Sequence, residues 1–381
     1  MRTPSAEPTP DPTPPTGRAS FVAELRDAVS PRTISLVVAV LAVQLGFVLS
    51  YIGAFHAPKP RHIPVAVVAP AQVSDQLVTQ LDNLPDEPLR ARPVTDEARA
   101  RTLILDRTVD AAIVVDPRSS TDTLLVASAA GPAVSATTQQ IAETIEAQQH
   151  RQVRVTDLRP PDAGDGRGMS SFYLALGWIV GGYLAAAILG MAAGARPANP
   201  HRTIVRLGVL ALYAVASGLG GALIAGPVMG ALSGHLLELW AIGALTVFAS
   251  AAVTVALQTL LGVIGIGAAV VLFVVLGNPS AGGAYPHVLL PPFWRAIGSW
   301  LPPGAATTAV RNTVYFAGHA IAQSLTVLAG YAVLGIATAV VAAALHRRRA
   351  RHPDPSRSTL AAAVPRLARR WSTTGERTAR T

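Results

Sequence analysis

The stretch ISLVVAVLAVQLGFVLSYIGAF, residues 34–55, decides the fold class, because it is long, strongly apolar and free of charged residues. A hydrocarbon core about 30 Å thick is crossed by about 20 helical residues, so this run predicts a transmembrane helix. It is too long and too far from the N-terminus for a usual cleaved signal peptide, and we interpret it as an anchor. Hydrophobic residues make up 50% of the 381 positions and charged residues 14%, which is typical of a membrane protein.

Further apolar runs follow at residues 172–193, 204–225, 239–257, 261–276 and 321–345. Together with residues 34–55 they predict an α-helical polytopic membrane protein with six transmembrane helices, four of them within residues 170–276. The fourth and fifth runs are almost continuous. They fit a tight helical hairpin or a single broken helix.

Arginines mark one side of the membrane, since cytoplasmic ends of spans carry an excess of basic residues. They precede the first span, fill the loop between the second and third, and follow the sixth: Arg26, Arg32, Arg196, Arg202, Arg206, Arg347, Arg348, Arg349 and Arg351. This pattern predicts a multi-pass protein of the cell membrane with both termini cytoplasmic and residues 56–169 and 277–320 outside. The net charge of +9 therefore indicates membrane orientation and not binding to nucleic acid.

Residues 56–169 hold most of the 22 acidic residues and predict an extracytoplasmic α/β domain. Short apolar runs at 63–69, 111–115 and 123–127 are typical of buried strands. Helical periodicity covers 72–84, 98–105 and 133–149, and Asp96 with Glu97 marks a helix start. The Pro/Gly/Asp-rich stretch 159–168 links this domain to the next span.

The two tails differ from the rest of the chain. Residues 1–18 are rich in proline and threonine and predict a disordered tail. Residues 19–33 fit an amphipathic helix on the inner membrane surface, or alternatively the frayed start of the first span. Residues 346–381 form a basic cytoplasmic tail attracted to lipid.

Motifs for chemistry are missing from the sequence. It contains no cysteine, and its one lysine, Lys59, has none of the glycines of a nucleotide-binding P-loop. The nine histidines are scattered and predict no metal site. No ionisable residue lies in the middle of a predicted span, where proton- or sodium-coupled carriers usually keep one. We therefore expect no enzyme and no cofactor in this chain, and an energy source on a separate protein.

Residues 277–320 interrupt the apolar pattern before the last span. Their prolines, glycines and tryptophans predict a cap or re-entrant segment of short helices, at 292–301 and 305–316, on the outer ends of the spans. Its candidate residues are Asn278, Pro279, Gly282, Gly283, Trp294, Arg295, Trp300, Pro302, Pro303, Gly304 and Arg311. For Arg295 and Arg311 we expect either anchoring at the interface or attraction of an anionic group.

Three phrases of the sequence carry a family resemblance: GNPSAGGAYP (277–286), LLPPFWRAIGSWLPPGAATTAVRNTVYF (289–316) and VDAAIVVDPRSS (109–120). In these phrases and in the order of its spans and outer segments, the chain resembles the YhgE/Pip-like branch of ABC-2 type membrane proteins. Actinobacterial members related to the fungal nitrosoguanidine-resistance family are similar in size and layout. Asp116 departs from the more usual hydrophobic or basic residue of that family's corresponding phrase. The resemblance covers roughly residues 20–345. It implies a homodimeric permease subunit that exports a hydrophobic or amphipathic substrate, with a separate ABC ATPase holding the ATP.

Under this resemblance the remaining residues acquire expected roles. The substrate path would include Gln44, Gly181 and Gly182, although Gln44 can instead bond a neighbouring helix and glycines often only pack. The ATPase would dock on the basic loop: Arg196, His201, Arg202 and Arg206. The alternative is a non-transporting envelope scaffold or receptor, such as an accessory of type VII secretion or a protein used in phage infection.

Overall fold

The computed structural model describes residues 30–197 and 199–351. The predicted N-terminal tail, most of the amphipathic segment and most of the basic C-terminal tail lie outside the described residues. The chain divides into two compact units, residues 1–49 and residues 50–381. The described part of the first unit is helical and belongs to α2 (Pro31–Phe55), which continues into the second unit.

Within the described residues, five helices are long and apolar enough to cross a membrane. They are α2, α6 (Ser170–Ala193), α7 (Pro200–Leu223, continued by a π-helical segment Ile224–Val228), α8 (Leu236–Leu261) and α12 (Ala322–Arg351). A sixth apolar stretch, α9 (Ile264–Val270) with the π-helical segment Val271–Gly277, is shorter than such a helix. The protein is therefore mostly helical and fits a polytopic membrane protein.

A hairpin, and not a single broken helix, joins α8 to α9. Gly262 ends α8 in a left-handed conformation (φ +69°) that suits glycine, and its N–H donates to the Gln258 carbonyl. A Cβ added at Gly265 would lie 2.3 Å from the Leu257 carbonyl oxygen, so α9 turns back onto the last turns of α8.

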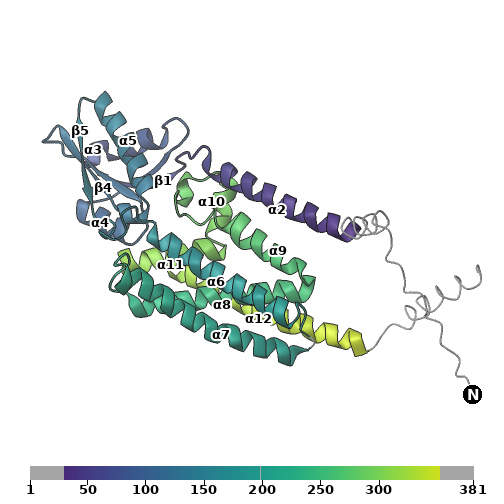
Figure 1. The fold of residues 1–381 in the computed structure, drawn as a ribbon. Coiled ribbons are helices and arrows are strands. Elements are labelled where there is room, and N and C mark those ends of the chain that lie inside the picture. Colours follow the sequence, from purple (N-terminus) through teal and green to yellow (C-terminus); the bar gives the residue numbers. More distant parts are fainter. Residues whose placement is uncertain (1–29, 198, 352–381) are drawn as a thin grey trace, which may run out of the picture. The chain divides into compact units, whose positions relative to one another are not determined.

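Residues 63–157 form a five-stranded sheet with helices on both faces (Figure 1). The strands are β1 (Ile63–Val68), β2 (Leu89–Pro93), β3 (Ala111–Val114), β4 (Thr121–Val126) and β5 (Gln152–Asp157), in the order β2-β1-β3-β4-β5. Only β3 and β4 pair antiparallel. The predicted strands and helices of the α/β domain are present. The two edge strands β2 and β5 were not predicted.

Alternating side chains divide the sheet between two cores. Ile63, Val65 and Val67 of β1 face a cluster formed with α3 (Ala71–Asp82) and α5 (Pro132–Gln148). Ala66 faces the opposite side, where α4 (Glu97–Leu105) covers the sheet. This second cluster continues without a break into residues of α6, α7 and α8, so the α/β domain and the helix bundle share one core.

The cap segment contains a 3₁₀ turn His287–Leu289, α10 (Pro292–Gly298) and α11 (Pro302–Tyr315). The two short helices confirm the predicted ones, with α10 ending earlier and α11 beginning earlier. Helix α11 contacts α6, α8 and α12 and also the turn at Ser128–Ala130 of the α/β domain. It thus lies between the sheet domain and the long helices (Figure 1).

Candidate functional site

The cap segment is largely buried among the described residues, so it is not an exposed loop. Pro302, Pro303, Gly304 and Arg311 are buried with most of α11, and Pro279, Gly282 and Gly283 are buried in the turn before it. A Cβ added at Gly304 would lie 2.0 Å from the Gly298 carbonyl oxygen, which explains the glycine after two prolines. The prolines themselves occupy the first helical positions, where no N–H is needed.

The tryptophans of the cap separate into two environments. Trp300 is 62% exposed, as a tryptophan at a membrane interface would be. Trp294 is buried with Leu290 and Ala54 and so cannot serve as an exposed anchor. The difference follows from the short helix α10, which turns Trp294 toward the protein while Trp300 follows the helix end.

The turn before the cap helices is tied to several elements. The amide of Asn278 donates to the Tyr51 hydroxyl, and the Arg295 guanidinium donates to the Arg61 carbonyl over 3.2 Å. The Gly283 Cα lies against the ring of Phe172, because a Cβ there would be 2.5 Å from that ring. These contacts connect the cap to α2, to the α/β domain and to α6.

Arg311 is a buried cation and not an interface anchor. Its guanidinium donates to the Gly282 carbonyl over 3.1 Å. Tyr315 donates to the Asp165 carboxylate over 2.8 Å. Asp165 also accepts from the Ser170 N–H at the start of α6, so one carboxylate joins α11, the linker and a long helix.

The two ends of the cap pack into two hydrophobic clusters of the α/β domain. Leu289, with Tyr285 and Val288 packed beside it, belongs to the cluster on the α3 and α5 side of the sheet. Val310 and Phe316 belong to the cluster on the α4 side. The cap therefore holds the sheet from both faces, and we expect the sheet domain and the cap to move together.

An apolar groove lies between α6 and α7. Its volume is about 650 Å³, and no charged residue lines it. The lining residues come from α6, α7, the π-helical continuation of α7 and the adjoining loops: Gly164, Ser170, Tyr173, Leu174, Gly177, Trp178, Ser217, Gly220, Gly221, Ile224, Ala225, Met229 and Ala231. Gly221 allows the indole of Trp178 to lie against α7, since a Cβ at Gly221 would be 2.3 Å from Nε1.

The two glycines expected on a substrate path face different helices. Gly181 lies near the groove, because its Cα faces the Tyr213 and Ser217 hydroxyls of α7. Gly182 instead packs against α8, where a Cβ would be 2.0 Å from the Ser250 hydroxyl oxygen. Gln44 is exposed on the part of α2 that belongs to the first compact unit.

A buried polar stripe on α8 was missed from the sequence. Thr246, Ser250, Thr254 and Gln258 recur every fourth residue and are fully buried. The three hydroxyls donate to carbonyls of the preceding turn of α8. The Gln258 amide has no hydrogen-bond partner within the described residues, and it lies against Gly190 of α6. Spacing by four residues is the signal that would have found the stripe.

The basic loop expected to dock an ATPase is only partly exposed. Arg206 is buried and donates to the Gly194 carbonyl over 2.8 Å, so it closes the loop and is not available for docking. Arg196 donates to the Leu260 carbonyl over 3.4 Å and so lies beside the end of α8. His201 and Arg202 are exposed in the first turn of α7 and keep their predicted accessibility.

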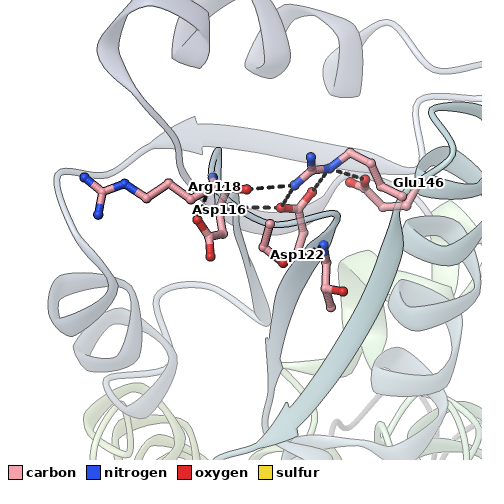
Figure 2. Close-up of polar contacts among 7 residues, drawn as sticks. Asp116, Arg118, Asp122 and Glu146 are labelled. Carbon is pink, nitrogen blue, oxygen red and sulfur yellow. Dashed lines mark hydrogen bonds and ion pairs between the residues drawn. The ribbon is translucent and has the colours of Figure 1, made fainter.

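The phrase at residues 109–120 leads into a cluster of charges at the end of the sheet. Figure 2 shows the Asp122 and Glu146 carboxylates facing one guanidinium, which belongs to Arg151. Its Nε lies 2.8 Å from Asp122 and 3.5 Å from Glu146, and a second nitrogen donates to the Asp116 carbonyl over 3.0 Å. Burial and the neighbouring Asp122 raise the pKa of Glu146 to about 7. The cluster fixes the loop, while the Arg118 side chain points away from it (Figure 2).

No group of three or more His, Cys, Asp or Glu side chains in the described residues could hold a metal ion. Comparisons with protein-family models, with characterised proteins and with solved structures found no match for this chain.

Proposed function

We propose that this chain is the membrane subunit of an ABC-2 type exporter, with its α/β domain outside the cell and both termini in the cytoplasm. It works as a homodimer, moves a hydrophobic or amphipathic substrate and is energised by a separate ATPase. The apolar groove of about 650 Å³ between α6 and α7 carries this proposal, because it offers an uncharged molecule a binding place along two long helices.

The proposed topology has six spans: α2, α6, α7, α8, α9 with its π-helical continuation, and α12. The fifth covers only part of the bilayer, since its 14 residues extend about 20 Å at a helical rise of 1.5 Å per residue. The cap segment that follows completes the crossing with buried backbone, which the membrane tolerates where protein surrounds it. Arg196, Arg202, Arg347 and Arg348 then mark the cytoplasmic side.

Energy from a separate protein suits the interior of the bundle. The polar groups buried along α8 are hydroxyls and one amide, which do not titrate and so cannot couple transport to a proton. In the proposed mechanism the ATPase binds near the exposed His201 and Arg202. Its closure shifts α6 and α7 on α8 and so opens and closes the groove.

The test of this proposal is purification of the chain from its native membranes in mild detergent, with identification of the proteins that accompany it. We expect a Walker-type ATPase whose ATP hydrolysis is stimulated by amphipathic compounds. Gly220 faces open space in the groove, so Gly220→Leu should fill the groove and reduce the stimulation. Gly208, which also faces open space on α7 but does not line the groove, provides the matched control Gly208→Leu.

The second candidate function is an envelope scaffold or receptor. The edge strand β5 favours it, because β5 pairs only with β4 within the described residues and Val155 on it is 37% exposed. Such an edge can bind an extended segment of another protein. Recovery of secretion components without an ATPase in the same purification would favour this candidate over the exporter.

A further inference from the structure

A second groove lies where α8, α11 and α12 meet. Its volume is about 710 Å³. The lining residues are mostly apolar or small: His235, Glu238, Ala241, Ile242, Leu245, Thr313, Ala317, Gly318, Ile321, Leu325 and Ala329. From Glu238 to Leu245 it follows α8 for roughly 10 Å, at a rise of 1.5 Å per residue. It is separate from the groove between α6 and α7.

The charge of this groove distinguishes it from the first one. Glu238 is the only carboxylate among the lining residues, and no arginine or lysine lines the groove. Glu238 is exposed in the first turn of α8 and has no hydrogen-bond or ion-pair partner among residues 30–197 and 199–351. His235 is the other titratable lining residue. His319, which follows the lining residue Gly318 in the chain, pairs with Asp106 at 2.6 Å.

We propose that this groove binds a lipophilic monocation, with its apolar body along α8 and α12 and its positive charge beside Glu238. A carboxylate at one end of an apolar groove orients such a molecule and excludes an anion of the same shape. Burial of apolar surface supplies most of the affinity, and the carboxylate supplies the preference for a positive charge. The inference concerns binding and does not depend on the proposed transport function.

The groove permits a test with two probes of matched shape and opposite charge. Tetraphenylphosphonium is a lipophilic cation and tetraphenylborate is the corresponding anion. Radiolabelled tetraphenylphosphonium would be equilibrated with the full-length protein in neutral detergent, and binding would be measured against protein-free micelles. We expect saturable binding that excess unlabelled tetraphenylphosphonium displaces and that tetraphenylborate does not.

Three variants in the groove and one control outside it locate the binding. Glu238→Gln keeps the shape of an exposed side chain and should weaken tetraphenylphosphonium binding by about tenfold, as expected for a contact at the edge of water. Ala241→Trp and Ala329→Trp start from exposed lining residues and should abolish binding by filling the groove. Ala337→Trp, at an exposed α12 residue outside the groove, should leave it unchanged.

Several outcomes would overturn the proposal. These are the absence of saturable binding by the wild type, equal competition by tetraphenylborate, or unchanged affinity in Glu238→Gln. If a tryptophan variant elutes as an aggregate in size-exclusion chromatography, Glu238→Gln still decides the charge, because it alters a surface side chain only. The assigned location would also be rejected if Gly220→Leu, in the other groove, abolished tetraphenylphosphonium binding while Ala241→Trp left it unchanged.

Discussion

Replacing Glu146 by glutamine is expected to remove a pH dependence from the stability of the α/β domain. The carboxyl of Glu146 is buried beside Asp122, and this environment raises its pKa from 4.5 to about 7, although Arg151 acts in the opposite direction. In the unfolded chain the same carboxyl ionises near pH 4.5. Below pH 4.5 Glu146 is protonated in both states and does not reduce the free energy of unfolding. As the pH rises from 4.5 to 7, ionisation favours the unfolded chain and lowers that free energy, and above pH 7 the loss is complete.

The size of this loss follows from the difference in pKa. One pKa unit corresponds to 1.36 kcal/mol, so about 2.5 units give an upper limit of about 3 kcal/mol. Water entry and side-chain rearrangement reduce the cost of a buried charge below that limit. Glutamine keeps the size of glutamic acid and can still donate to Asp122, so Glu146→Gln should match the wild type near pH 4.5 and exceed its stability at pH 8.

Amide hydrogen exchange of the full-length protein in detergent would measure this effect locally. The free energy of opening would be compared at pH 5 and pH 8 for β4 and α5, after correction for the intrinsic exchange rate. Glu143→Gln is the matched control, because Glu143 is exposed on the same helix. Equal loss of protection with rising pH in the wild type and in Glu146→Gln would refute the reasoning.

Three further predictions concern packing, the cap and topology. Gly182→Val should destabilise the protein by about 1–3 kcal/mol because α6 touches α8 there, whereas Gly177→Val, which faces open space, should lower the melting temperature little. Tyr315→Phe should cost about 1–2 kcal/mol, read as a lower melting temperature, because the buried carboxylate loses its hydroxyl donor. Single cysteines placed at Arg118 and at Arg348 should react with an impermeant thiol reagent from opposite sides of the membrane. The experiment is possible because the natural chain has no cysteine. Labelling of both cysteines from one side would contradict the proposed topology.

The long helices could be predicted from the sequence because hydropathy alone sets them. Residues 261–276 are as apolar as the long helices, but too few of them remain for a full span after Gly262 reverses the chain. Only the packing of Gly265 against α8 shows that the two helices form a hairpin. The edge strands β2 and β5 escaped prediction because they alternate polar and apolar residues and carry arginine. An edge strand needs burial on fewer sides and so gives a weak signal.

The candidate site was harder to predict because burial of polar groups depends on distant residues. Arg206 and Arg311 look like surface cations in the sequence, yet each finds a carbonyl acceptor supplied by another segment. Trp294 is likewise buried by apolar residues of another segment, including Ala54 of α2. Glu238, in contrast, is exposed in the first turn of α8, as expected for a carboxylate at the end of an apolar helix.

The two grooves and the cap together suggest how the parts of the chain affect one another. Helix α8 is the most buried of the long helices. The first groove is lined by α6 and α7 and the second by α8, α11 and α12, so displacement of α6 or α7 changes the first and displacement of α12 changes the second. Helix α11 contacts α6, α8 and α12 and also ends in the core of the sheet domain. Because the cap holds that domain from both faces, a ligand bound to the sheet domain would stabilise particular positions of these helices. By the reciprocity of linked equilibria, a ligand in either groove would then change the affinity for such a sheet-domain ligand by the same factor.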